Sequence, residues 1–499
     1  MKKTNLLVAA AFALCLAWSA SASDIYVDKT YTGTDSDGSS ARPYKTIQLA
    51  INRGVPGDTV KVSAGVYSEM LVLRDQISVV GTDYSKVTIT GNATGSVVQA
   101  LNLTGMLLKN LTITYGTAQT GGGINVDKST ITIDTCLIYN CSAQDGGGIY
   151  ASSSFITITD TTISSNKATR CGAGLAVFGT AGSTTASMLT MDNSSVMNND
   201  STAYGYGGGV WVTCATATID QCAISYNWAK DGGGLYWVKS TGALRRSTID
   251  HNYISRVGSG MFIDTSDPKL TRNNFNSNES LGMAGGVYFW QSSNAAMYNC
   301  LIDHNAAHGI GGAVVIDTCT PKIINDTIVS NTGQNSYGGL CVFGSVGIPT
   351  VLNCIFWGNI DDIQGVTVNY CQVQNGDAGT ENKATDPAFK SPSTFDYTLL
   401  PTSPCVNTGS PGTQYNDRDG TQNDRGYTGG PYGTAVGDVN DDGCVNVLDL
   451  LVIRTNLNGD PTSSGLARCD VNKDGAINIL DMLAIRKNLN AGCGKPQWP

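Results

Sequence analysis

Glycines recur through the middle of this 499-residue chain at nearly constant intervals, and each is followed by a short apolar run. The intervals are 25 to 27 residues, with one of 35, and the glycines are Gly123, Gly148, Gly174, Gly209, Gly234, Gly260, Gly286, Gly312 and Gly339. Between them apolar and polar residues alternate, as in Thr130 to Asp134. Alternation inside a fixed repeat predicts one coil of short strands per repeat, stacked on its neighbours. The sequence therefore predicts an all-β fold, a parallel β-helix solenoid.

Two polar registers run in step with the glycines. One is made of Asn140, Asn166, Asn199, Asn227, Asn252, Asn278, Asn305, Asn331 and Asn359. The other lies six residues earlier, at Asp134, Asp160, Asn193, Gln221, Arg246, Arg272, Asn299, Asn325 and Asn353. Coils stacked about 4.8 Å apart place equivalent side chains in ladders that can satisfy turn backbone. Both registers are interpreted as structural, with about three more coils before Gly123 and an extra loop at Gly179 to Ser187.

The N-terminus has the pattern of a secretory signal, with Lys2 and Lys3 before an apolar run and Ala20 to Ala22 at its end. We therefore expect a secreted, extracellular protein, and no other apolar stretch is long enough to span a membrane. Without Lys2 and Lys3 the chain has 29 basic and 40 acidic residues, a net charge of −11. This charge argues against a nucleic-acid partner, whose phosphates need Lys and Arg.

Fourteen cysteines remain once the signal segment, with Cys15, is removed. In an exported protein they are candidates for disulfide bonds. Three of them, Cys444, Cys469 and Cys493, fall in the last part of the chain. Because three is odd, at least one of these is expected to be free or paired elsewhere.

Near the C-terminus the chain spells one twelve-residue loop twice, from Asp438 to Asp449 and from Asp470 to Asp481. Oxygen ligands at loop positions 1, 3, 5, 7, 9 and 12, with glycine at position 6, are what Ca²⁺ requires. The predicted ligands are Asp438, Asn440, Asp442, Cys444, Asn446 and Asp449 in the first loop and Asp470, Asn472, Asp474, Ala476, Asn478 and Asp481 in the second. Each loop runs into an apolar-periodic helix, and no helix precedes the first, so the pattern is a duplicated half EF-hand.

This tandem, over about residues 436–494, resembles a dockerin, the small α-helical module that attaches a secreted protein to a cohesin-type receptor. The resemblance implies calcium as cofactor and a cohesin as partner. Two features depart from it: the copies are 32 residues apart, and the apolar pairs Val447-Leu448 and Ile479-Leu480 stand where many dockerins carry polar recognition residues. The alternative is a calcium-stapled terminal cap with no receptor.

The body is similar to the right-handed parallel β-helix proteins of the pectate-lyase-like superfamily. The similarity rests on Tyr44 to Ile51 and Gly57 to Val60 at the start and on Asp386 to Phe389 and Ser403 to Gly409 at the end. Together with the N-terminal signal pattern and the duplicated loops, it predicts four parts: a signal peptide (1–22), a parallel β-helix (24–388), a closing segment and linker (389–435) and the dockerin-like calcium module (436–494). The superfamily includes lyases, hydrolases, epimerases and non-catalytic adhesins, so fold leaves function open.

An aromatic stripe is the first candidate binding feature. If the residue after each marker glycine points inward, the next points outward. The outward residues then include Tyr150, Trp211, Tyr236, Phe262 and Tyr288, with Phe178 and Trp290 two residues further on in their coils. An exposed aromatic stripe on a rigid sheet would stack sugar rings of a polysaccharide. The alternative is that the glycine-rich connections or the loop at 179–187 cover it.

A basic and histidine cluster is the candidate catalytic feature, with Arg246, Arg272, His251 and His304 proposed to converge beside the stripe. A uronate lyase needs a base and a group that neutralises the carboxylate. A hydrolase instead needs two facing carboxylates, for which Asp250 and Asp303 are candidates. The sequence thus predicts a secreted polysaccharide-degrading or polysaccharide-processing protein tethered by its dockerin; any enzyme would be a polysaccharide lyase or O-glycosyl hydrolase. The alternative is a non-catalytic carbohydrate-binding or adhesin protein.

Overall fold

The computed structural model describes residues 22–180, 187–202, 205–291, 295–334, 337–344, 347–433, 437–440, 444–460, 469–472 and 474–490. The predicted signal segment, most of the predicted loop at 179–187, Asp442 and Cys493 lie outside these residues. Among the helices in the described ranges, none combines the length and apolar character needed to cross a membrane.

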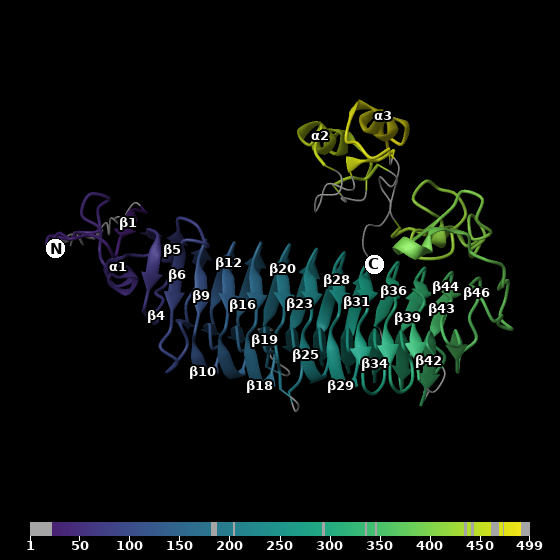
Figure 1. Ribbon diagram of the computed structural model, residues 1–499, viewed down its shortest axis with the longest axis horizontal. Helices are drawn as coiled ribbons and strands as arrows, with labels where there is room; N and C mark the ends of the chain where they lie inside the picture. The colour runs from purple at the N-terminus through teal and green to yellow at the C-terminus, as the bar shows by residue number, and fades with distance from the viewer. Residues whose placement is uncertain are drawn as a thin grey trace, which may run out of the picture.

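Short parallel strands stack coil upon coil into an elongated solenoid (Figure 1), which confirms the predicted fold class. Sheet 1 contains β1 (Asp24–Val27), β2 (Thr59–Val62), β5 (Ser78–Gly81), β8 (Met106–Lys109), β12 (Thr130–Asp134), β16 (Phe155–Thr159), β20 (Met188–Asp192), β23 (Thr216–Asp220), β27 (Thr241–Arg245), β31 (Asp267–Thr271), β35 (Ala296–Tyr298), β39 (Lys322–Ile324) and β43 (Thr350–Leu352). Sheet 2 contains β3 (Gly65–Tyr67), β6 (Val87–Thr90), β9 (Thr112–Thr114), β13 (Leu137–Tyr139), β17 (Thr162–Ser164), β21 (Ser195–Met197), β24 (Ala223–Ser225), β28 (Thr248–Asp250), β32 (Asn274–Asn276), β36 (Leu301–Asp303), β40 (Thr327–Val329), β44 (Ile355–Trp357) and β46 (Gln372–Val373).

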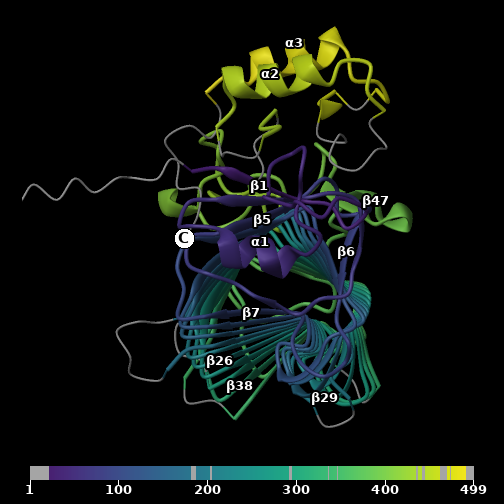
Figure 2. The same ribbon diagram turned by 90° about the vertical axis from the view of Figure 1, so that its left-hand side faces the viewer.

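Two further sheets complete each coil (Figure 2). Sheet 3 contains β4 (Leu71–Val72), β7 (Val98–Leu101), β11 (Ile124–Asp127), β15 (Ile149–Ser152), β19 (Leu175–Phe178), β22 (Val210–Thr213), β26 (Leu235–Val238), β30 (Met261–Asp264), β34 (Val287–Trp290), β38 (Val314–Asp317), β42 (Leu340–Phe343) and β45 (Ile363–Gln364). Sheet 4 has two parts, β10 (Thr117–Thr120), β14 (Ser142–Asp145) and β18 (Lys167–Cys171), then β25 (Trp228–Asp231), β29 (Tyr253–Val257), β33 (Glu279–Ser280), β37 (Ala306–Ala307) and β41 (Thr332–Gly333). The chain visits sheets 3, 1, 2 and 4 in turn, and the predicted extra coils before Gly123 are present.

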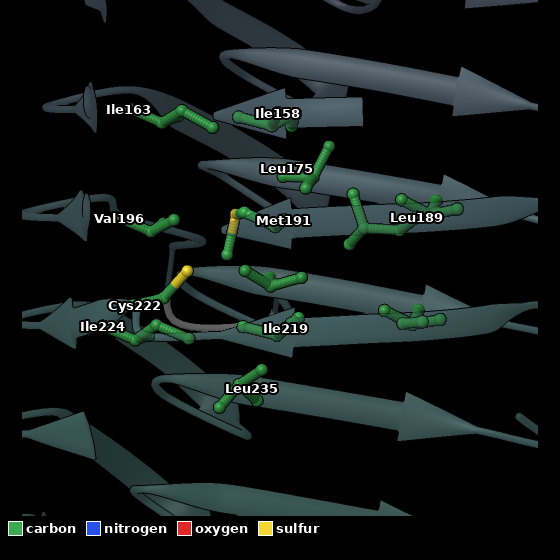
Figure 3. Packing of buried hydrophobic residues seen from close by; sticks show 14 of the residues in the cluster. Ile158, Ile163, Leu175, Leu189, Met191, Val196, Ile219, Cys222, Ile224 and Leu235 are labelled. Carbon is green, nitrogen blue, oxygen red and sulfur yellow. The ribbon is translucent and has the colours of Figure 1, made fainter. Parts of the chain in front are cut away.

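The core is a set of side-chain ladders inside the solenoid. Ile158, Met191 and Ile219 are register partners on successive strands of sheet 1, and all three are fully buried. Figure 3 shows them facing residues of sheets 2 and 3, such as Ile163 and Leu175. Because coils stack in register, every inward position of one strand packs on the same position of the next.

Asparagines form a continuous ladder at the turn between sheets 2 and 4. The Asn227 side-chain oxygen accepts the Asn199 backbone N–H at 3.1 Å and the Asn199 amide at 3.0 Å, and its own amide donates to Asn252 at 3.0 Å. The same bonds link the ladder from Asn166 to Asn359, which confirms the structural interpretation. Asn140 is the exception: it is exposed, and Cys141 takes the ladder position, with its N–H donated to Asn166 at 3.0 Å.

The second polar register occupies the left-handed turn residue between sheets 1 and 2. Arg246 and Arg272 have φ angles of 45° and 57°. The ladder at this turn is formed not by these residues but by the inward-facing residue that follows each of them, Ser247 and Asn273. One such bond joins the Ser247 N–H to the Asn273 side chain at 3.1 Å. Asp134 lies one position too early, at the end of β12, and Thr135 is its left-handed residue.

The described cysteines of the body form no disulfide bonds, although export of the protein would make such bonds plausible. Twelve cysteines are free thiols, and eleven of these are buried. Several fill ladder positions; the Cys354 N–H, for example, lies 3.2 Å from the Cys371 sulfur. Burial raises the pKa of Cys136 to about 12, which keeps this thiol protonated. In the C-terminal module Cys444 is disulfide-bonded and Cys469 is free, so the odd count is resolved as expected.

Both ends of the solenoid are covered. Helix α1 (Ile47–Arg53) buries Ile47, Ala50 and Ile51 against the first coil. At the other end a closing segment carries the antiparallel strands β47 (Phe389–Ser391) and β48 (Asp396–Leu399), the short helix η1 (Pro392–Thr394) between them, and η2 (Thr413–Tyr415). The Asn299 amide donates to the Tyr427 carbonyl at 2.9 Å, so this hydrogen bond joins the closing segment to a turn between sheets 1 and 2.

The C-terminal module has two helices, α2 (Val447–Thr455) and α3 (Ile479–Lys487), which contact each other. Each begins at an asparagine N-cap with a capping box, Asn446 with Asp449 and Asn478 with Asp481. The two copies are interlocked: the Asn458 N–H donates to the Ile477 carbonyl at 2.9 Å, and the Asn490 N–H to the Val445 carbonyl at 2.8 Å. A small core that includes Ile453 and Ile485 joins them.

Candidate functional site

The aromatic stripe points outward from sheet 3, as predicted, but much of it is not exposed. Tyr150, Trp211, Tyr236, Phe262 and Tyr288 occupy the second position of their strands, and Trp290 and Phe178 the fourth. Tyr236, Phe262 and Tyr288 have relative exposures of 8%, 2% and 4%. The other four are half-buried. The prediction of an exposed stripe is therefore wrong for Tyr236, Phe262 and Tyr288.

Two causes bury the stripe. First, in-register coils stack the rings on one another: Tyr236 and Phe262 have centroids 4.6 Å apart and planes 18° apart. Second, the connections between sheets 4 and 3 fold over it, so Tyr206 lies 5.8 Å from the Tyr236 ring and Met283 and Ala284 join the same cluster. The faces that would stack a sugar are thus occupied by other side chains.

Charged groups line the same connections. The buried Asp231 carboxylate accepts the Arg256 Nε–H at 2.8 Å, and Arg170 pairs with Asp145 in the same way three coils earlier. The Tyr236 and Tyr288 hydroxyls donate to Asp264 at 3.1 Å and to Asp317 at 2.9 Å. Burial raises the pKa of both tyrosines, so they remain hydrogen-bond donors.

The four candidate catalytic residues border the outer face of sheet 2, away from the stripe on sheet 3. Arg246 and Arg272 stand at the turn from sheet 1, whereas His251 and His304 stand at the turn toward sheet 4. A three-residue strand, about 10 Å long, separates the arginine edge from the histidine edge. The expected convergence of all four beside the stripe is therefore not what the structure shows.

Arg246 is held by an ion pair that sequence reasoning missed. Its Nε and Nη2 donate to the two Asp220 oxygens at 2.8 and 2.6 Å, and both side chains are largely buried. Asp220 is the last residue of the equivalent strand one coil earlier, so the strand register could have predicted this ion pair. Asp192, its partner one coil before, has its pKa raised by burial and by the Asp220 charge.

Each predicted histidine is paired with the aspartate before it. His251 Nδ1 lies 2.7 Å from Asp250, and its ring stacks on Tyr226 at 4.8 Å. His304 Nδ1 lies 2.9 Å from Asp303, whose burial raises the carboxyl pKa. The pairs stand two coils apart with Asn276 between them, as the sequence predicted.

The second predicted calcium loop is described except at residue 473. The Asp470 carboxylate accepts the N–H groups of Asp474 at 3.1 Å and Gly475 at 2.9 Å, which closes the loop around the first predicted ligand. Gly475 has a φ of 88°, the left-handed turn that position 6 requires. Asp481 accepts the Asn472 and Asn478 N–H groups at 3.0 and 2.8 Å. In the first loop Asp449 makes the equivalent bonds to Asn440 and Asn446, at 3.1 and 2.8 Å.

Comparisons with known proteins agree with this architecture. The model of the right handed beta helix region matches residues 76–213 and 184–385, and the model of the dockerin type I domain matches residues 436–490. No curated protein matches the chain.

Solved structures resemble the chain at low identity. Pectate lyase Pel9A is 12% identical, covering 82% of this chain and 96% of its own, with a TM-score of 0.39. XylC in complex with xylose is 12% identical, covering 73% and 87%, with a TM-score of 0.41. The A-module of the Azotobacter vinelandii mannuronan C-5 epimerase AlgE6 is 10% identical, covering 68% and 95%, with a TM-score of 0.40. No activity follows from likenesses at this level.

Proposed function

The chain belongs to the right-handed β-helix family, and from this premise we propose that it is a secreted, polysaccharide-active protein attached through its dockerin to a cohesin-type receptor. The observation that carries the proposal is the duplicated calcium half-EF-hand with an apolar surface on each helix. Such a module serves attachment, so the solenoid is the part that meets the polysaccharide.

The proposed docking surface is apolar and present twice. On α2 it consists of Val447, Leu448 and Leu451, with exposures of 70%, 51% and 51%. On α3 the equivalent residues Ile479, Leu480 and Leu483 have exposures of 67%, 51% and 48%. Apolar groups this exposed on a small module mark an interaction surface. They support a receptor over a terminal cap, because a cap would bury them.

The loop residues fit calcium by their chemistry. Asp470, Asn472 and Asp474 lie within one hydrogen-bonded turn, with Asp481 behind them at the start of α3. Carboxylate and amide oxygens of this kind suit a hard cation. Ca²⁺ would offset the mutual repulsion of these carboxylates and so stabilise the loop that precedes α3.

Titration of the full-length protein with purified cohesin modules, with and without Ca²⁺, tests the attachment. We expect binding that requires Ca²⁺ and is lost when Leu451→Asp and Leu483→Asp are combined. Val66→Asp, a change at an exposed apolar residue of the solenoid, is the matched control. Binding that survives the double change would refute the assigned surface.

Two functions of the solenoid are compatible with polysaccharide as partner. The Asp250–His251 and Asp303–His304 pairs on one face favour an enzyme, and Asp250 and Asp303 stand about 10 Å apart, near the separation in inverting hydrolases. The burial of Asp303 and the Asp220 partner of Arg246 favour non-catalytic binding. Incubation with pectic, alginate-like and neutral polysaccharides, read for unsaturated products and for new reducing ends, separates lyase, hydrolase and binding protein.

A further inference from the structure

A cavity lies between the closing segment and the outer face of sheet 2. Strands β47 and β48 lie beside the last coils of the solenoid, on the side of sheet 2 (Figure 2). The space between them has a volume of about 320 Å³. Its wall includes Ser330 and Trp357 from the solenoid and Asp386, Phe389, Pro392 and Tyr397 from the closing segment.

The aromatic walls of this cavity are fixed. Tyr397 is 3% exposed, and its ring meets that of Phe389 edge to face, with centroids 5.3 Å apart and planes at 83°. Trp357 packs in the same cluster but stays half-exposed, so part of its indole is open to a ligand. The rings of the stripe lie on strands of one sheet, whereas these rings come from two different sheets and do not stack in register.

The polar groups of the cavity select against negative charge. Asp386 is exposed at the wall, where its Oδ1 accepts the Ala388 N–H at 2.7 Å. Asp303 is buried one coil away from Val329 of the lining. No Lys or Arg is among the residues that line the cavity. A carboxylated ligand would therefore meet repulsion without a cation to pair with.

We propose that this cavity binds one neutral sugar ring, the end residue of a glycan chain that lies along the outer face of sheet 2. The volume is at the small end of ligand pockets, about 300–1,000 Å³, which suits a single ring rather than a longer segment. Apolar ring faces pack on Trp357 and Phe389, and hydroxyls meet Asp386 and Ser330. This deepens the proposed function, on which it rests for the class of ligand.

His304 acts here as a positioning residue. Its ring packs edge-on against Phe395, 4.8 Å between centroids, and lies 6.5 Å from Tyr397. Phe395 ends η1 in a left-handed turn, with a φ of 62°. Because Asp303 holds Nδ1 of His304, the imidazole is a fixed support beneath the turn that closes the cavity.

The test uses the full-length protein with Ca²⁺ and the methyl glycosides of glucose, xylose and galacturonic acid, followed by calorimetry and tryptophan fluorescence. We expect a neutral glycoside to bind and Trp357→Ala to weaken it roughly tenfold or more. Phe389→Ala is a second variant in case the first misfolds, and Tyr84→Ala, at an exposed ring far along the solenoid, is the matched control. His304→Gln is expected to weaken binding less than Trp357→Ala and to loosen the closing segment in hydrogen exchange.

Asp386→Asn tests the selectivity, and we expect it to bring the affinity for the galacturonide close to that for the neutral glycosides. Preference of the unmodified protein for the galacturonide would overturn the proposal, as would unchanged affinity in Trp357→Ala. Cohesin binding is measured on the same samples. Its presence alongside failed sugar binding would reject the cavity assignment while the attachment stands.

Discussion

Replacing Asn227 by leucine should cost the solenoid several kcal/mol, although the two side chains are similar in size. Asn227 is fully buried in the asparagine ladder. Its oxygen accepts from the Asn199 N–H and the Asn199 amide, and its own amide donates to the Val196 carbonyl at 2.9 Å. Leucine leaves both Asn199 donors without this acceptor. At about 1–3 kcal/mol for each buried unsatisfied group, the loss is roughly 2–6 kcal/mol.

Urea denaturation of the full chain, followed by far-UV circular dichroism, measures this change. The matched control is Asn198→Gly, which directly precedes Asn199 in sequence but is exposed and has a φ of 56° that glycine adopts freely. We expect the control to lie within about 1 kcal/mol of the unmodified protein. A loss below about 1 kcal/mol in Asn227→Leu would mean that the ladder bonds do not stabilise the solenoid in the way described.

Three other properties can be tested directly. Asp470→Ala removes the acceptor for two loop N–H groups, so we expect weaker Ca²⁺ binding at one site and less calcium-induced helix by circular dichroism; unchanged binding would exclude this loop as a site. Phe262→Ala should lower stability by about 3 kcal/mol and leave polysaccharide retention unaltered, because the ring is buried; the opposite pattern would restore the stripe as a binding platform. Burial and the Asp424 charge raise the pKa of Asp417 to about 7. The protonated Asp417 carboxyl therefore contributes fully to the stability of the fold below its ordinary pKa of 3.8, and this contribution is lost as the pH rises to about 7. Asp417→Asn should flatten the fall in melting temperature over that interval, and an unchanged pH profile would contradict the shift.

The solenoid could be predicted because its repeat is local. A glycine every 25 to 27 residues and the alternation after it determine which side chains face inward. The same logic placed Trp211 and Tyr236 on the outer face and His251 two coils from His304. The predicted ladder position was wrong by one residue at Asn140, because Cys141 occupies the ladder site with a different side chain.

The exposure of the outer faces could not be predicted, because it depends on segments distant in sequence. The stripe is covered by connections that contain small residues such as Ala284, and the repeat locates these connections but does not determine how far each one folds over the rings. His304 is contacted by Phe395, ninety-one positions later in the chain. The cavity likewise joins Trp357 to Tyr397, which lies in a separate segment of the chain.

The buried cysteines of the solenoid are free thiols among the described residues, so packing of this part of the chain does not require disulfide formation there. Because the described thiols of the solenoid serve as packing groups in the turns, a reducing buffer removes no cross-link from those residues. Among the twelve free thiols of the described residues, Cys214 alone is partly exposed, at the left-handed turn after β22. A maleimide dye should therefore react there first, giving a single label on the outside of the solenoid for fluorescence studies of how the protein meets its polysaccharide and its receptor.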